Sequence, residues 1–354
     1  MVVAVAVPVA LMVVGEITPA VGSSDVTYYT LGAVQPMAIV GPSAQKVTAA
    51  VRRIGALRSP TARIDGHGGK VDADIAIIDS GVDRDHPDLN VAGGVNCAGG
   101  SPKAFDDDNG HGTFVAGVAA ARDNAIGVVG VAPGARIWAV KVTDKSGVFT
   151  SASLICGLKW VLKHRPVIDV VNMSFENPQA LGKCPNPPAA DPVHLAVCKL
   201  VKQGTTVVAS AGNGARDATG LAMASYEEVI TVSAFTDTDG RPGGKGKPPT
   251  CLPGGAMEKD DTFAFFSNYG PTVDIAAPGV CVGSTFLNGQ YSNAGSGTSF
   301  SAPLVAGAAA LVRARHPAWG PAQVRKAILS AATPGPVAED PDTFAEPILN
   351  VSGF

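Results

Sequence analysis

The sequence predicts a single α/β domain with a mostly parallel central sheet and helices on both faces. Short apolar runs alternate along the chain with longer segments of helical periodicity. Neither a fixed-period repeat nor a composition break divides the 354 residues into two domains. Hydrophobic residues make up 46% of the chain, which indicates a buried core, and 42 Gly with 27 Pro indicate many tight turns.

Six short runs rich in Val, Ile and Ala are the predicted strands. Continuous rather than alternating apolar character is typical of strands that are buried on both faces of a parallel sheet. The runs are residues 74–78, 135–142, 168–173, 205–210, 229–234 and 273–276.

Four segments are predicted helices, at residues 114–121, 151–163, 299–315 and 321–330. The first and third consist mainly of small residues, which suits helices packed closely on a sheet. The second places Leu154, Leu158 and Val161 on one face. The fourth begins with Pro321, which is favoured in a first helical turn.

The two ends of the chain are expected to lie outside this domain. The start is apolar to Val14 and ends in Ala20-Val21-Gly22, which is typical of a secretory signal peptide, although no Lys or Arg precedes Lys46. A buried apolar strand is the alternative. The apolar run is too short to span a bilayer comfortably, so no stable membrane span is expected. The expected division is a signal peptide, a short pro-like or leader segment, the α/β domain and a loosely attached C-terminal tail, at residues 1–22, 23–42, 43–334 and 335–354.

Cysteine usage points to an extracellular location. The six cysteines include no Cys-x-x-Cys pair and no zinc-like spacing with His, and their even number fits three disulfides. Cys184 with Cys198 would close a short Pro-rich loop, and Cys251 with Cys281 would pin a Gly/Pro/Lys-rich excursion. Cys97 would then pair with Cys156. Sequence alone does not choose among the pairings, and buried free thiols are the alternative.

Charge argues against a nucleic-acid partner. The formal net charge is −3, charged residues are only 16% of the chain, and no run of Lys and Arg exceeds two residues. A phosphate-binding surface needs a clustered basic patch, which this pattern lacks.

Four residues carry the groups needed to attack a peptide carbonyl. Asp79, His111, Asn213 and Ser299 supply an acid, an imidazole, a carboxamide and a hydroxyl, each at a predicted junction between elements. These groups can orient a base, accept a proton, stabilise an oxyanion and act as a nucleophile. Each residue alone is more often a cap or a turn residue, but Asp, His, Ser is a known chain order for a catalytic triad. The joint pattern predicts acyl transfer.

The local sequence suits these roles. Asp79 follows a predicted strand directly, and ligands of parallel sheets bind beyond the carboxyl ends of the strands. His111 lies at a predicted helix start, where the helix dipole disfavours protonation of a base. Ser299 also begins a helix, so its own N–H and the dipole favour a developing oxyanion. The Asn213 amide would be the second donor.

The chain resembles the subtilisin-like serine peptidases, the subtilases, over residues 43–332. The matching stretches are DSGVD (79–83), HPDL (86–89), HGTFVAG (111–117), GVVGVAP (127–133), VNMS (171–174), AGN (211–213), APG (277–279) and GTSFSAP (297–303). The resemblance implies a subtilisin-like three-layer sandwich. It also implies a secreted, monomeric serine endopeptidase that works through an acyl-enzyme, with Asp79, His111 and Ser299 as the triad and Asn213 at the oxyanion. No cofactor is required for that chemistry.

The resemblance also implies that two backbone segments bind the polypeptide substrate as an extended strand. The residues assigned to substrate binding are Asn172, Ser174, Glu176, Ala211 and Gly212. Glu176 replaces a Gly of the usual family pattern. We hypothesise that it lines the primary pocket and favours basic substrate residues; a Glu that points into solvent is the alternative.

For metals, Asp88 resembles a ligand of the family calcium site, and Asn124 lies in the matching loop, so a structural Ca²⁺ is a hypothesis. No N-terminal ligand is identifiable from the sequence. Family members usually carry a propeptide, and the segment before Ser43 is too short for a full one.

Two other functions are alternatives to a peptidase. A catalytically silent binding or scaffolding protein of the same fold is the alternative, because a fold does not by itself fix a function. A dinucleotide-binding protein would need Gly-x-Gly-x-x-Gly after the first strand, which residues 79–83 do not supply.

Overall fold

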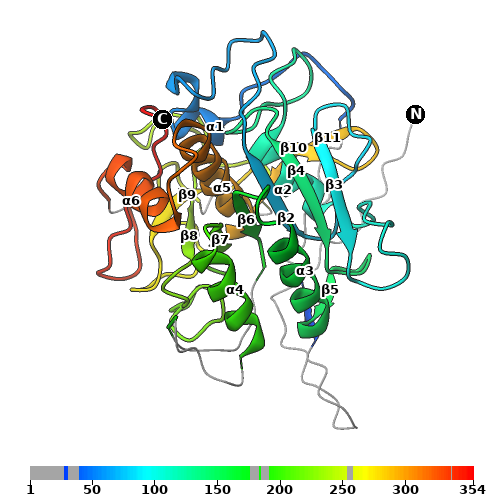
Figure 1. Ribbon diagram of the computed structural model, residues 1–354. Helices are drawn as coiled ribbons and strands as arrows, with labels where there is room; N and C mark the ends of the chain where they lie inside the picture. The colour runs from blue at the N-terminus through cyan, green and yellow to red at the C-terminus, as the bar shows by residue number, and fades with distance from the viewer. Residues whose placement is uncertain (1–27, 31–39, 176–182, 185–190, 253–257, 336) are drawn as a thin grey trace, which may run out of the picture.

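A seven-stranded sheet of parallel strands forms the centre of the fold (Figure 1). The computed structural model describes residues 28–30, 40–175, 183–184, 191–252, 258–335 and 337–354. The strand order is β3-β4-β2-β6-β7-β8-β9. The bounds are β2 Asp74–Asp79, β3 Val91–Asn96, β4 Arg136–Lys141, β6 Val170–Met173, β7 Thr206–Ser210, β8 Ile230–Phe235 and β9 Ile275–Pro278.

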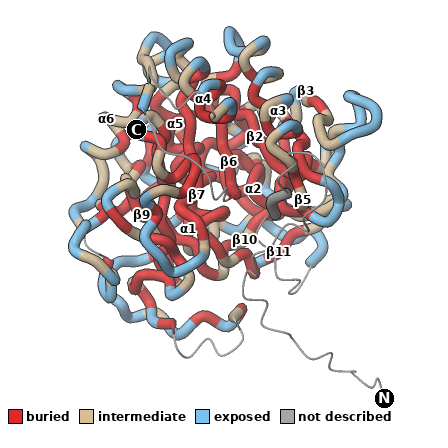
Figure 2. The backbone as a smooth tube through the Cα atoms, turned by 90° about the horizontal axis from the view of Figure 1, so that it is seen from below, coloured by how far each residue is buried: buried red, intermediate tan, exposed pale blue. Residues whose placement is uncertain are grey.

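Helices cover both faces of this sheet, which confirms the predicted three-layer α/β class. Alternate side chains of the strands enter two separate cores. One core includes α2 (His111–Ala120), α5 (Thr298–Arg315) and α6 (Pro321–Ala331), and the other includes α3 (Ser151–His164) and α4 (Pro192–Lys202). Figure 2 shows the central strands and α5 as mainly buried and the exposed segments at the periphery.

All six predicted strands and all four predicted helices are present, with boundaries that shift by a few residues. The remaining elements were not predicted. They are β3, α4, the short helices α1 (Ala49–Arg53) and η1 (Ala56–Arg58), the antiparallel pair β1 (Tyr28–Thr30) and β5 (Val148–Thr150), and the hairpin of β10 (Val282–Phe286) and β11 (Gln290–Gly295).

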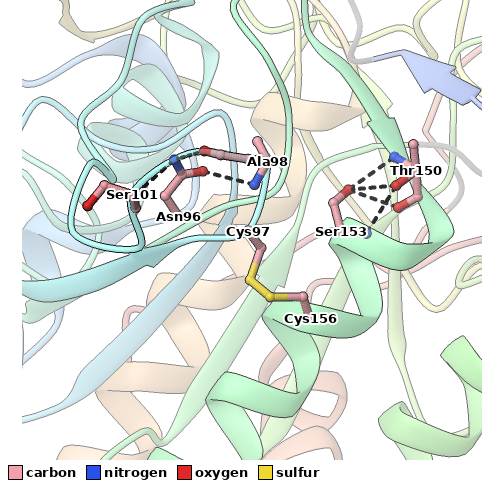
Figure 3. Close-up of a disulfide and its surroundings, with 8 residues drawn as sticks. Asn96, Cys97, Ala98, Ser101, Thr150, Ser153 and Cys156 are labelled. Carbon is pink, nitrogen blue, oxygen red and sulfur yellow. Dashed lines mark hydrogen bonds between the residues drawn. A yellow bond between two sulfur atoms is a disulfide. The ribbon is translucent and has the colours of Figure 1, made fainter.

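Three disulfides join the six cysteines, Cys97–Cys156, Cys184–Cys198 and Cys251–Cys281, which is one of the pairings that the sequence left open. Figure 3 shows the first of these, which links the end of β3 to α3 across the edge of the sheet. The start of α3 is fixed nearby by a capping box in which Thr150 and Ser153 each accept a hydrogen bond from the other's backbone N–H.

The expectation of a loosely attached C-terminal tail is wrong. Ile348 pairs with Ala276 of the edge strand β9, where Ala276 N donates to Pro347 O at 2.9 Å and Leu349 N donates to Ala276 O at 2.9 Å. Leu349 and Val351 are buried. An edge strand leaves backbone groups unpaired, and this segment satisfies them.

The expected signal peptide at residues 1–22 lies outside the described residues. Within the described part of the chain, no helix combines the length and apolar character that a bilayer span would require.

Candidate active site

Asp79 and His111 are in direct contact at the carboxyl edge of the sheet. Asp79 is the last residue of β2 and His111 the first of α2, and both are buried. His111 Nδ1 lies 2.9 Å from Asp79 Oδ1 and 3.0 Å from Oδ2. A proton on Nδ1 donates to this carboxylate, which leaves Nε2 free to accept another proton.

Glycine at position 112 allows this close approach of α2 to the end of β2. A Cβ atom on Gly112 would lie 2.1 Å from Gly81 O and 3.1 Å from Asp79 Cβ. The backbone N–H of Gly112 donates a hydrogen bond to Ser80 Oγ at 2.9 Å. Ser80 N also donates to Asp79 Oδ1 at 2.7 Å, which helps to fix the carboxylate towards the ring.

Asp107 anchors the start of α2 and was not identified from the sequence. Its Oδ1 accepts hydrogen bonds from Ser80 Oγ and from the backbone N–H groups of Asn109 and Gly110, and its Oδ2 accepts two from Thr113. Burial raises the pKa of this carboxyl, while the surrounding donors oppose that shift. The available signal was an acid just before a predicted helix start, which is typical of an N-terminal cap.

Asn213 lies just beyond β7, and its amide orientation is fixed by the start of α5. Its Oδ1 accepts hydrogen bonds from Thr298 N at 2.8 Å and from Thr298 Oγ1 at 2.9 Å. A Cβ atom placed on Gly297 would lie 3.6 Å from Asn213 Nδ2 and 3.8 Å from Ser299 N. The Asn213 amide and the Ser299 backbone N–H therefore both lie next to Gly297, and two donors to one oxyanion must be neighbours.

Ser299, the second residue of α5, is buried against Ser174. Its hydroxyl donates to Ser174 O at 3.1 Å, and Ser174 Oγ donates in return to Ser299 O at 2.8 Å. The next residue, Phe300, packs on the His111 ring with 5.5 Å between ring centroids. The start of α5 thus lies beside the imidazole.

Four of the five residues assigned to substrate binding, Asn172, Ser174, Ala211 and Gly212, are buried at the carboxyl ends of the adjacent strands β6 and β7. Asn172 Nδ2 donates to Ser174 Oγ at 2.9 Å, and Ala211 and Gly212 follow β7 directly. Glu176 lies outside the described residues.

Asn268 holds the loop after β7 and was also missed from the sequence. Its Nδ2 donates to Ala211 O at 2.8 Å, and its Oδ1 accepts from Gly214 N at 2.9 Å and from Arg216 N at 3.2 Å. Asn268 is 55 positions from Asn213, so no local pattern pairs them.

Asp88 and Asn124 come together away from this centre. Asn124 Nδ2 lies 3.0 Å from Asp88 Oδ1, and Val128 N donates to Asp88 Oδ2 at 3.1 Å. Gln45 Oε1 accepts from the backbone N–H groups of Asn124 and Ala125, so a third side-chain oxygen reaches the same loop. Burial raises the pKa of Asp88 to about 6. One carboxylate and two amide side chains around this partly exposed loop carry the oxygen type that Ca²⁺ prefers, and here Asn124 turns its Nδ2 to Asp88 while its Oδ1 accepts from Ile126 N.

Comparisons with known proteins agree with this architecture. Residues 72–346 match the family model Peptidase_S8, described as the subtilase family. Subtilisin NAT from Bacillus subtilis subsp. natto is 38% identical over 280 residues, which cover 79% of this chain and 65% of that protein. Subtilisin from Bacillus pumilus is 38% identical over 280 residues, which cover 79% of this chain and 90% of that protein.

Among solved structures, a chain described as the crystal structure of a cold adapted subtilisin-like serine proteinase matches with a TM-score of 0.67 and 25% identity. The match covers 86% of this chain and 98% of that one. The match with subtilisin NAT, and likewise that with subtilisin E from Bacillus subtilis (strain 168), covers 65% of the relative's length. By its family match and its 38% identity to subtilisins, this chain belongs to the subtilase family.

Proposed function

We propose that the protein is a secreted serine endopeptidase in which Ser299 is the nucleophile, His111 the general base and Asp79 the group that orients the base. The contact of His111 Nδ1 with the Asp79 carboxylate carries this proposal. It leaves Nε2 as the proton acceptor, beside a helix start that presents a serine hydroxyl.

In the first step, the Ser299 hydroxyl turns from Ser174 O towards His111 Nε2 and attacks the scissile carbonyl carbon. The proton moves to Nε2 as the C–O bond forms. The carbonyl oxygen becomes an oxyanion and accepts hydrogen bonds from Asn213 Nδ2 and Ser299 N–H. Asp79 stabilises the imidazolium without taking its proton.

The imidazolium then donates its proton to the leaving amine as the C–N bond breaks, and the acyl group stays on Ser299. A water molecule, deprotonated by the same imidazole, attacks the ester and releases the acid. The reaction consumes only the peptide and water, so it requires no cofactor.

The substrate is a polypeptide that binds as an extended strand along residues 172–176 and 209–213. The protein acts as a monomer. These segments begin in the last residues of β6 and β7, which are neighbours in the sheet, so a substrate laid along them reaches Ser299. Glu176 remains our hypothesis for a preference for Lys or Arg. A peptide-library profile without enrichment of these residues at the primary position would contradict it.

Secretion is supported by the three disulfides, which persist in oxidising compartments. The N-terminus of the protein recovered from culture medium, determined by mass spectrometry, tests the expected cleavage before Ser23.

A structural Ca²⁺ would be held by Asp88, with Asn124 and Gln45 as neutral oxygen ligands. Its chemistry is to neutralise a buried carboxylate and to tie the segment near residue 45 to the loop after α2. It takes no part in bond cleavage.

Labelling with a fluorophosphonate tests the proposed activity. The reagent phosphonylates only a serine that is activated by a base and flanked by oxyanion donors. We expect one adduct per chain, located on Ser299 by peptide mass spectrometry, and none in the Ser299→Ala variant. A folded protein that takes no adduct would instead be the silent binding or scaffolding protein.

A further inference from the structure

The Cys184–Cys198 disulfide differs from the other two disulfides in the side chains around its sulfur atoms. His194 and Glu228 each place a possible metal-ligand atom within 4.8 Å of both sulfurs and of one another. Among the residues that the structure describes, neither of the other two disulfides belongs to such a group. The proposed function uses none of these four side chains.

The four side chains meet at one carboxyl oxygen. Glu228 Oε1 lies 2.8 Å from Cys184 Sγ and 3.2 Å from Cys198 Sγ, and it is in hydrogen-bonding contact with His194 Nε2. A sulfur atom in a disulfide carries no proton that it could donate. The carboxyl group therefore faces two sulfurs that give it no hydrogen bond in the oxidised protein.

Two of the four side chains project from the same face of α4. His194 and Cys198 are four positions apart, which is about one helical turn. The Tyr226 ring stacks on the His194 ring with 3.8 Å between the centroids, so the imidazole is held in one orientation. His194 is buried, and its Nδ1 has no hydrogen-bond partner. The imidazole therefore depends on Nε2, at the cluster, for its polar contact.

The donor set and its spacing fit a zinc ion. Two thiolates, one imidazole and one carboxylate are typical ligands of four-coordinate zinc. Bonds of about 2.0–2.3 Å place tetrahedral ligands roughly 3–4 Å from one another, so atoms that already lie within 4.8 Å need only small movements. Cys184, Cys198 and Glu228 are partly exposed, which gives an ion access from solvent.

We propose that Cys184 and Cys198, once their disulfide is reduced, bind a zinc ion together with His194 and Glu228. A dithiol supplies two electrons and two protons: the S–S bond breaks, each sulfur becomes a thiol, and the dithiol becomes a disulfide. Zinc then displaces the two thiol protons, because it binds the thiolate. The ion would tie residue 184 to α4, as the disulfide does in the oxidised protein.

Zinc binding to the full-length protein tests this proposal, in a Ser299→Ala background that prevents self-digestion. The disulfides are reduced with a water-soluble phosphine, which takes oxygen from water and becomes its oxide. The protein is then titrated with zinc in the absence of air, and the bound zinc per chain and its affinity are measured. Glu228→Gln keeps the shape of the side chain and removes its charge. Glu227→Gln is the matched control, because Glu227 is adjacent, exposed and paired with Lys183.

We expect the reduced parent to bind one zinc ion more per chain than the oxidised parent, and Glu227→Gln to behave as the parent does. Cys184→Ser should lose this ion, whereas Cys97→Ser should keep it, since Cys97 lies in another disulfide. Glu228→Gln should bind the ion at least about tenfold more weakly, the scale found when a metal ligand loses a neighbour. None of these readouts depends on peptidase activity.

A reduced parent that gains no zinc would overturn the proposal, and so would equal affinity in Glu228→Gln and Glu227→Gln. If Glu228→Gln does not fold, Cys184→Ser decides alone, and retention of the ion by that variant would overturn the proposal. Near-UV circular dichroism verifies that the reduced parent is folded. If reduction unfolds it, the proposal requires zinc to restore the native spectrum of the parent and not that of Cys184→Ser.

Discussion

Asp107 Oδ2 accepts hydrogen bonds from both the backbone N–H of Thr113, at 2.9 Å, and its hydroxyl, at 2.6 Å. Asp107 thereby holds the first turn of α2, which begins with His111. Its other oxygen bonds Ser80, the neighbour of Asp79. One partly buried acid therefore contacts both elements that supply the His111–Asp79 pair.

We expect Asp107→Asn to lower kcat about tenfold and to destabilise the fold by about 1–3 kcal/mol, because an amide has one acceptor oxygen and would leave N–H groups unpaired. Steady-state kinetics and chemical unfolding measure both effects. Asp106→Asn is the control, since Asp106 is adjacent and half exposed. Equal behaviour of the two variants would contradict a positioning role for Asp107.

Asn213→Ala should reduce kcat by ~10²–10³ with little change in KM, a range that was itself measured on a subtilisin. In the proposed mechanism, the amide contacts the oxyanion in the transition state and not the bound ground state. Thr298→Ser, which keeps the hydroxyl that bonds Asn213, should retain activity. A loss that falls mainly on KM would argue that Asn213 only binds substrate.

Gly112→Ala should lower both the stability of the fold and the peptidase activity. The added methyl would lie 2.1 Å from Gly81 O and 3.2 Å from Asp79 Oδ1, so α2 must shift away from Asp79. We expect about 1–3 kcal/mol of lost stability, together with a lower kcat. Gly41→Ala is the control, because a Cβ there meets no atom within 4 Å. Wild-type kcat in Gly112→Ala would be incompatible with the described geometry.

Calcium should raise the melting temperature of the Ser299→Ala protein, and Asp88→Asn should reduce that increase. Removal of the charge weakens the ion's attraction, while the amide preserves the contact with Val128 N. Thermal unfolding with and without chelator measures the difference. An unchanged calcium response in Asp88→Asn would eliminate this residue as a ligand.

Asp237 provides a pH-dependent test of the fold. Burial, with Asp260 and Asp261 nearby, raises its pKa from 3.8 to about 7, despite an ion pair with Arg53 at 3.0 Å. Between these values the native state holds a proton that the unfolded state has lost. The contribution of Asp237 to the free energy of unfolding therefore falls as pH rises from about 4 to about 7.

Asp237→Asn removes this contribution. The free energy of unfolding of the parent minus that of Asp237→Asn should become smaller as pH rises through this window. Chemical unfolding in the Ser299→Ala background, at several pH values, measures it. A difference that does not vary with pH would show that Arg53 keeps Asp237 ionised throughout.

The central strands were predictable because burial on both faces of the sheet selects apolar side chains, which are visible in the sequence. The runs that became β2, β6 and β7 are mainly apolar without alternation, and every residue of these strands is buried. By contrast, β3 contains Gly93 and Gly94 and looks like a loop. A Cβ on Gly94 would lie 2.2 Å from Ala139 O, so the glycine is there because β4 packs closely, which is a tertiary cause.

The hairpin of β10 and β11 escaped prediction for a similar reason. Ser284 and Thr285 are polar but buried, because their hydroxyls donate to the carbonyl oxygens of Phe114 and Thr113 in α2. Their burial depends on partners 170 and 172 positions away. A local pattern of hydrophobicity does not identify hydrogen-bond partners so far away in the sequence.

Local order in the sequence was sufficient to predict most of the sheet and its main helices, and it led to the proposed roles of Asp79, His111, Asn213 and Ser299, because each lies at a junction between two elements. Tertiary contacts alone revealed the contacts of Asp107, Asn268 and Gln45 and the packing of the C-terminal segment on β9. The periodicity of apolar residues in the sequence indicates which residues are buried. The partner of a polar side chain depends instead on which segments, far apart in the sequence, become neighbours when the chain folds.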